Sequence, residues 1–244
     1  MVERKIPEEV QKFIDKYFNL SIAGKVVVCP YFINPSSTFF RQPVMAGKGS
    51  PSELETYANE IVTDSSLTSD EIRKKLLEHG IGIDCSGFVY QVFDFWLTSV
   101  GKGELKDYLP KESTLRVRKF LSRKLKPVSS VSADMLTTAP LATQIALKDI
   151  KPGDLIRTRG GKHVLLVTKV AFTSENEPQT LTFVNSPREY ARNGVRYGEI
   201  RIKNMDLGQS VWDDLDPGEK INYAYKGYRE LMSKNGVWRL NLPL

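Results

Sequence analysis

Cysteine and histidine are scarce in this sequence, which has two of each among 244 residues. Cys29 and Cys85 are too few for a disulfide framework or a four-cysteine metal site. His79 and His163 occur without a metal-binding spacing such as His-Glu-x-x-His. We therefore expect neither a metal nor an organic cofactor, and at least one cysteine remains available for chemistry.

Long apolar runs are absent as well. No segment reaches the roughly 18 apolar residues that a membrane span needs. The first residues, Met-Val-Glu-Arg-Lys-Ile-Pro, lack the continuous apolar region of a secretory signal. The sequence therefore predicts a soluble, cytoplasmic protein without a membrane span, or an extracytoplasmic one if a leader has been removed.

The excess of positive charge is small, with 35 Lys and Arg against 29 Asp and Glu and a net charge of +6. Most basic residues are dispersed, which is not typical of a nucleic-acid-binding protein. The densest basic cluster, at 116–126, has apolar residues at helical spacing. This pattern favours a surface helix with a solvated basic face over a patch for nucleic acid or an anionic surface. We expect no nucleic-acid partner.

Helical patterns precede strand patterns along the chain. Helices are predicted at 7–18, 51–62, 69–79 and from residue 85 to about 100. After a Pro-Gly turn, strands are predicted at 155–158, 163–170, 180–185, 195–202 and 237–240. Helices followed by adjacent short strands indicate an α+β protein with an antiparallel sheet, and not a Rossmann fold or a barrel.

We expect a single catalytic domain over residues 1–244. Within it, 1–81 form an N-terminal helical and loop region, and 82–205 form the catalytic core. An insertion at about 101–147 includes a helix predicted from Ser113, and 206–244 form a C-terminal extension.

The segment around Cys85 ends a loop and begins an apolar helix. Asp84 is a suitable N-cap for this helix. Phe88, Val92 and Trp96 recur at a spacing of four and predict burial along one stripe. The thiolate of a cysteine in the first turn of a helix is stabilised by unpaired backbone N–H groups and by the positive end of the helix dipole. Cys85 is therefore predicted as a nucleophile.

A thiol nucleophile needs a base, and the base needs a polar group that orients it. His163 begins a predicted strand downstream of Cys85, and Asn185 ends the next strand on the face of Leu181 and Phe183. In an antiparallel pair the end of one strand lies beside the start of the other, so we expect Asn185 near His163. Taken singly, each residue is more typical of a structural role; their order favours a Cys-His-Asn triad.

Three motifs resemble those of a known family. Gly-Ile-Asp-Cys-Ser-Gly-Phe-Val at 82–89 resembles the nucleophile motif of the NlpC-type cell-wall cysteine peptidases. Asp-Ile-Lys-Pro-Gly-Asp-Leu at 149–155, followed by His163-Val164, is similar to their entry into the histidine strand. Phe-Val-Asn-Ser at 183–186 is similar to the strand that carries their third triad member. The resemblance covers about 82–100 and 147–200.

The resemblance implies a papain-like fold, in which the nucleophile helix packs on a central antiparallel sheet, here with helical insertions. It also implies hydrolysis of amide bonds in short peptides, typically the γ-D-glutamyl to diamino acid bonds of peptidoglycan. Cys85 would be the nucleophile, His163 the base and Asn185 the orienting residue, where many members have a second histidine. Tyr31, which follows Pro30, matches a tyrosine that lines the family's site, and it would bind substrate or the oxyanion.

Further substrate or oxyanion contacts are expected from Asp84 and Ser86, which flank the nucleophile, and from Arg188 toward a substrate carboxylate. The expected partner is a small peptide derived from peptidoglycan, but another amide or a thioester also fits the triad. Two alternatives remain open. One is an acyltransferase with the same triad, and the other is a binding module of the same fold without turnover, attached to anionic polymers through 116–126.

Overall fold

The computed structural model describes residues 2–33, 43–110, 131–189, 194–214 and 220–244. The helix predicted from Ser113 and the basic cluster at 116–126 lie outside these residues. The chain forms two compact units. The first consists of 1–11, 132–185 and 197–243, and the second of 12–131, 186–196 and residue 244. The division falls within helix α1 (Glu8–Lys16).

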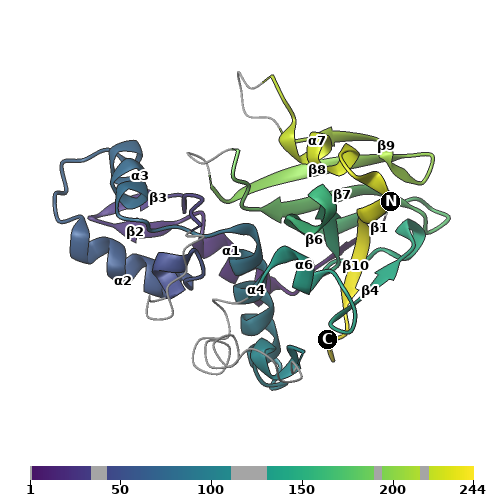
Figure 1. Ribbon diagram of the computed structural model, residues 1–244, viewed down its shortest axis with the longest axis horizontal. Coiled ribbons are helices and arrows are strands. Elements are labelled where there is room, and N and C mark those ends of the chain that lie inside the picture. Colours follow the sequence, from purple (N-terminus) through teal and green to yellow (C-terminus); the bar gives the residue numbers. More distant parts are fainter. Residues whose placement is uncertain (1, 34–42, 111–130, 190–193, 215–219) are drawn as a thin grey trace. The chain divides into compact units, whose positions relative to one another are not determined.

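The first unit is built on an eight-stranded sheet, seen in Figure 1, with the order β4-β10-β5-β6-β7-β8-β9. An additional strand, β1, pairs with β6 off this path. The strands are β1 (Val2–Lys5), β4 (Ala142–Ile145), β5 (Leu155–Thr158), β6 (His163–Phe172), β7 (Pro178–Asn185), β8 (Arg196–Lys203), β9 (Asp206–Asp213) and β10 (Gly236–Leu240). The pairs β1–β6, β4–β10, β5–β10, β5–β6, β6–β7 and β8–β9 are antiparallel. The α+β class with an antiparallel sheet is thus confirmed.

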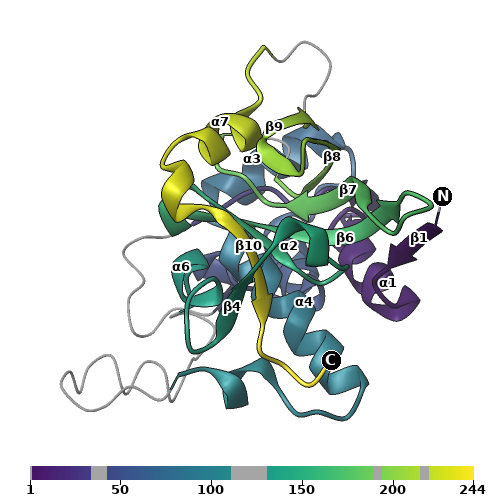
Figure 2. The ribbon, with the colours of Figure 1, turned by 90° about the vertical axis from the view of Figure 1, so that its right-hand side faces the viewer.

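One face of this sheet carries the core of the first unit. Alternate apolar side chains of the strands, such as Ile156, Leu165, Phe183 and Ile200, are fully buried in one cluster. Helix α7 (Tyr223–Arg229), which lies beside β9 in Figure 2, adds Tyr228 to the same cluster. At about 25 cal/mol per Å² of apolar surface, this burial is the main favourable term for folding of the unit.

The C-terminal region belongs to this sheet. Residues 206–244, expected as an extension, contribute β9, α7 and β10 to the first unit. Strand β10 lies between β4 and β5 and pairs with both. The predicted strands at 155–158, 163–170, 180–185, 195–202 and 237–240 all occur, whereas β1, β4, β9 and α7 were not expected.

The second unit is mainly helical. Its helices are α2 (Pro51–Ile61), α3 (Ser69–Glu78) and α4 (Cys85–Ser99), and its hairpin consists of β2 (Leu20–Ile22) and β3 (Lys25–Val27). Helix α2 begins as predicted, with Ser50 as N-cap in a capping box with Glu53. Helix α3 is capped by Thr68, which forms a capping box with Glu71 at the third helical position.

The remaining helical segments are short. They are α6 (Ala133–Leu136) and the 3₁₀ turns η1 (Pro43–Ala46), η2 (Leu105–Tyr108), η4 (Leu147–Asp149), η5 (Arg159–Gly161) and η6 (Met232–Lys234). Among the described residues, no helix has both the length and the apolar character needed to cross a membrane.

Candidate active site

Cys85 is the first residue of α4, as the sequence predicts. Asp84 is the N-cap, and its Oδ1 atom accepts a hydrogen bond from the backbone N–H of Gly87 at 2.7 Å. The helix is hydrophobic along most of its length, so burial holds its start in place. The Cys85 side chain thus lies at the N-terminal end of the helix, where backbone N–H groups and the helix dipole favour a negative charge.

Two chain segments hold the backbone just before Cys85. The N–H of Ile83 donates to the carbonyl of Pro30 at 3.0 Å, and the N–H of Asp84 donates to the carbonyl of Gly47 at 2.9 Å. Close approach requires glycine at position 82, because a Cβ there would lie 2.5 Å from the carbonyl oxygen of Pro30. The segment that precedes Cys85 is therefore fixed by backbone contacts with both of these chain segments.

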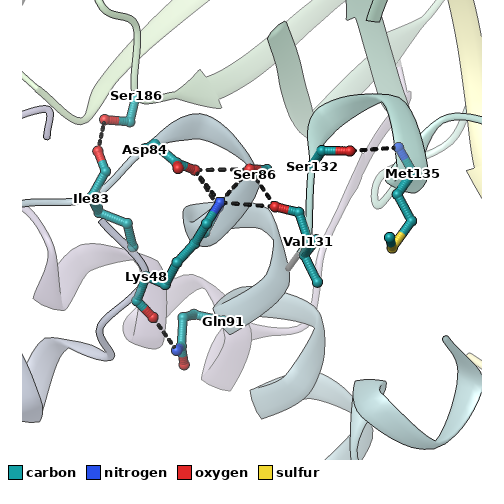
Figure 3. A network of polar contacts seen from close by, with 10 residues as sticks. Lys48, Ile83, Asp84, Ser86, Gln91, Val131, Ser132, Met135 and Ser186 are labelled. Carbon is teal, nitrogen blue, oxygen red and sulfur yellow. Dashed lines mark hydrogen bonds and ion pairs between the residues drawn. The ribbon is translucent and has the colours of Figure 1, made fainter. Parts of the chain in front are cut away.

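A buried lysine lies beside the start of α4, as Figure 3 shows. Lys48 Nζ forms an ion pair with Asp84 Oδ1 at 2.7 Å, and it also donates to Ser86 Oγ and to the carbonyl of Val131. Lys48 is only 5% exposed and Asp84 only 1%. No motif or periodic pattern in the sequence singles out Lys48, which lies in a stretch rich in Pro, Ser and Gly.

Ser86 and Asp84 belong to this polar cluster. Ser86 Oγ donates to Asp84 Oδ1 at 2.9 Å and lies 3.2 Å from the carbonyl oxygen of Val131. Both side chains are buried and bonded within the protein. Their contacts are those of residues that support the start of a helix, and a contact with substrate stays a prediction.

Tyr31 lies in the electrostatic surroundings of Cys85. Burial raises the pKa of the Tyr31 phenol, and negative charge on Cys85 and Asp84 raises it further, against the lowering effect of Arg188. The phenol is therefore protonated near neutral pH and can donate a hydrogen bond. Arg188 itself is exposed. The structure brings Tyr31, Asp84, Cys85, Ser86 and Arg188 together in the second unit.

The loop that carries Arg188 is tied to the segment that precedes Cys85. Ser186 Oγ, which is fully buried, donates to the carbonyl of Ile83 at 2.8 Å. This bond links residues 186–189 to the stretch that ends at Cys85 within the second unit. Arg188 is thereby held two residues from an anchored position.

His163 and Asn185 lie together in the first unit, as predicted. His163 begins β6, Asn185 ends the antiparallel strand β7, and Nε2 of His163 lies 3.2 Å from Oδ1 of Asn185. The register explains the contact: Leu166 pairs with Val184, so Asn185 is opposite Leu165 and diagonal to His163 on the same face. With Oδ1 as acceptor, Nε2 carries the ring proton and Nδ1 is left as the basic nitrogen.

The turn before His163 is held by side chains of the first unit. Arg157 Nη2 donates to the carbonyl of Gly160 at 2.9 Å, and Asn235 Oδ1 accepts from the N–H of Gly160 at 2.8 Å. Arg157 is itself fixed by an ion pair with Asp134 at 2.6 Å. These contacts restrain the strand start that carries His163, and they were not foreseen from the sequence.

Neither cysteine forms a disulfide. Within the described ranges, no group of three or more His, Cys, Asp or Glu side chains is arranged to hold a metal ion. Comparisons of the chain with protein-family models, curated proteins and solved structures gave no match. The resemblance to NlpC-type peptidases therefore depends on the motifs around Cys85, His163 and Asn185.

Proposed function

We propose that this chain is a cysteine hydrolase with a papain-like fold. Cys85 is the nucleophile, His163 the general base and Asn185 the residue that orients the imidazole. The observation that carries the proposal is the contact between His163 Nε2 and Asn185 Oδ1. A thiol nucleophile requires a base and a residue that orients the base, and this contact provides both. Both residues belong to the motifs that carry the family resemblance.

The second unit supplies complementary support. Cys85 opens a long apolar helix with an aspartate N-cap, which is the position where a thiolate gains most from the helix dipole. A helix that begins at the nucleophile, together with an antiparallel sheet that carries the base and its partner, is the arrangement that the papain-like assignment predicts.

The proposed reaction has two steps. The Cys85 thiolate attacks the carbonyl carbon of a peptide amide; a thioester forms and the C–N bond breaks as protonated His163 gives its proton to the leaving amine. His163 then removes a proton from water, which attacks the thioester and releases the carboxylic acid and the thiolate. The protonated phenol of Tyr31 is suited to donate to the oxyanion.

The proposed substrates are short peptides of the peptidoglycan type, with cleavage of γ-D-glutamyl to diamino acid bonds. Such peptides carry free carboxylates, and the exposed guanidinium of Arg188 can pair with one of them. The direct test is a mass-spectrometric screen of wall-derived peptides with the wild type, Cys85→Ala and Cys29→Ala. Hydrolysis that disappears only in Cys85→Ala supports the proposal, and hydrolysis that survives in Cys85→Ala contradicts it.

An acyl acceptor other than water would make the same site an acyltransferase. Adding a competing amine to the reaction separates the two activities, because a transferase forms a new amide at the expense of the free acid. We expect the free acid to dominate.

A further inference from the structure

The ammonium group of Lys48 is buried in the second unit and has an acceptor for each of its protons. Its acceptors are Asp84 Oδ1, Ser86 Oγ and the Val131 carbonyl, which together match the three protons of an ammonium group. Asp84 Oδ2 is buried without a hydrogen-bond partner among the described residues. Lys48 is therefore the cation that compensates the Asp84 carboxylate.

This compensation matters because Asp84 precedes Cys85 directly in the chain. A buried carboxylate without a counter-charge would raise the free energy of a thiolate next to it, since like charges repel strongly where water is excluded. It would also cancel part of the benefit that the positive end of α4 offers. With Lys48 in place the pair is neutral, and Asp84 can cap the helix without opposing the thiolate.

We propose that Lys48 is a positioning residue for the Cys85 thiolate, acting through Asp84. Its ammonium group neutralises the N-cap carboxylate, so that the helix start favours the ionised form of Cys85. This inference depends on the proposed function only in that Cys85 is the reacting thiol. It assigns a role to a residue outside the three motifs that carry the family resemblance.

Other charged and titratable groups surround the thiol. Among the described residues of the second unit these include Tyr31, whose pKa is raised by negative charge on Cys85, and Arg188 and Glu189, which act electrostatically on Tyr31. In the proposed triad His163 is a further one. None of these is changed by a substitution at position 48 or 84, so variants at these two positions isolate the Lys48–Asp84 pair.

The competing explanation is that Lys48 only ties the loop at 47–49 to α4 and to Val131. A structural tie would affect unfolding but would not shift the pH at which Cys85 becomes reactive. The experiment therefore measures the rate of iodoacetamide modification of Cys85 against pH, peptide by peptide with mass spectrometry. The variants are Lys48→Met, Asp84→Asn, the double variant and Lys48→Arg, each with a thermal unfolding curve.

If Lys48 acts through its charge, the two single variants shift the pH midpoint of Cys85 modification in opposite directions. Lys48→Met leaves Asp84 uncompensated and moves the midpoint upward by about one pH unit, whereas Asp84→Asn leaves Lys48 uncompensated and moves it downward by about one unit. Asparagine caps helices as well as aspartate, so this variant keeps the N-cap. The double variant returns near the wild-type midpoint, and Lys48→Arg stays there.

Equal midpoints in all variants, or shifts of the same sign in both single variants, would overturn the role of Lys48. If Lys48→Met does not fold, Asp84→Asn alone decides, because an unchanged or higher midpoint contradicts the coupling. The proposed function fails separately, when wild-type Cys85 reacts like a free thiol with a midpoint near about 8.5. The signs of the shifts still test Lys48 in that case.

Discussion

The two cysteines lie in the same compact unit and are both buried, yet their surroundings differ in kind. Cys29 follows the hairpin strand β3, is 0% exposed, and its Sγ lies 3.6 Å from the carbonyl oxygen of Pro30. Burial raises the pKa of the Cys29 thiol well above its usual value, against weaker lowering by Arg73 and a backbone hydrogen bond from Ile83. Cys85 is 7% exposed and opens a helix.

The comparison predicts that burial alone does not decide whether a thiol is inert. Both side chains have lost most of their contact with water, but only Cys85 faces the N-terminal end of a helix, where backbone N–H groups stabilise an anion. Near Cys29, the backbone N–H of Ile83 lowers the pKa of the thiol, but this N–H also donates to the carbonyl of Pro30. Cys29 thus provides an internal reference for each experiment on Cys85.

The largest expected effect is selective alkylation. In the native protein at about pH 6, iodoacetamide should modify Cys85 at least about a thousandfold faster than Cys29, since each unit of pKa changes the thiolate fraction tenfold. Peptide mass spectrometry of samples quenched over time gives both rates in one experiment. Comparable rates for the two thiols would remove the basis for a specialised Cys85.

A second, smaller effect is expected from the proposed base. His163→Ala should slow alkylation of Cys85 at about pH 6 by about a hundredfold, because the proposed triad requires the His163 imidazolium to stabilise the Cys85 thiolate. The matched control is His79→Ala, which removes the exposed histidine at the C-terminal end of α3. If both variants react at the wild-type rate, His163 is not the partner of Cys85.

A third effect concerns Asn185. Asn185→Ala should lower the Cys85 alkylation rate about five- to tenfold, the value of one hydrogen bond of about 1 kcal/mol that orients the imidazole. Asn185→His places an imidazole at this position, as in many NlpC-type peptidases, and should recover part of the loss. A larger loss in Asn185→His than in Asn185→Ala would show that the residue does not orient His163.

The contrast between the two cysteines was predictable from local sequence signals. Asp84 before Cys85, and apolar residues at helical spacing after it, define the start of α4, and the structure places that start where the pattern does. The contact between His163 and Asn185 was also predictable, because adjacent antiparallel strands bring the start of one beside the end of the other. These features depend on residues close in sequence or on one strand pairing.

Other features could not be predicted from local patterns. Lys48 is 36 residues from its ion-pair partner, and nothing in a glycine-rich stretch indicates that an ammonium group becomes buried. Strand β9 was missed because the β8–β9 hairpin turns through Asn204 and Met205, both with positive φ, instead of the usual Asn-Gly. Helix α7 was missed because Gly227 interrupts an aromatic-rich segment.

The smallest effect on Cys85 is expected from Cys29→Ala, which should leave the alkylation rate of Cys85 within about twofold, because Cys29 forms no disulfide with Cys85 and is not a member of the proposed triad. The main effect of Cys29→Ala is expected on the pH dependence of the free energy of unfolding. Burial raises the pKa of Cys29, so above about pH 8.5 the unfolded thiol ionises while the folded thiol stays protonated, and stability falls by about 1.4 kcal/mol per pH unit.

Removing the Cys29 thiol should reduce this loss of stability at high pH. Between about pH 8.5 and about pH 9.5, the free energy of unfolding should fall by about 1 kcal/mol less in Cys29→Ala than in the wild type, although the variant is less stable at neutral pH because of the cavity. Urea unfolding in the presence of reductant, followed by circular dichroism at each pH, measures the difference. Parallel pH profiles for the two proteins would mean that Cys29 ionises equally in the folded and unfolded chains, and Cys29 could then not serve as the inert reference for Cys85.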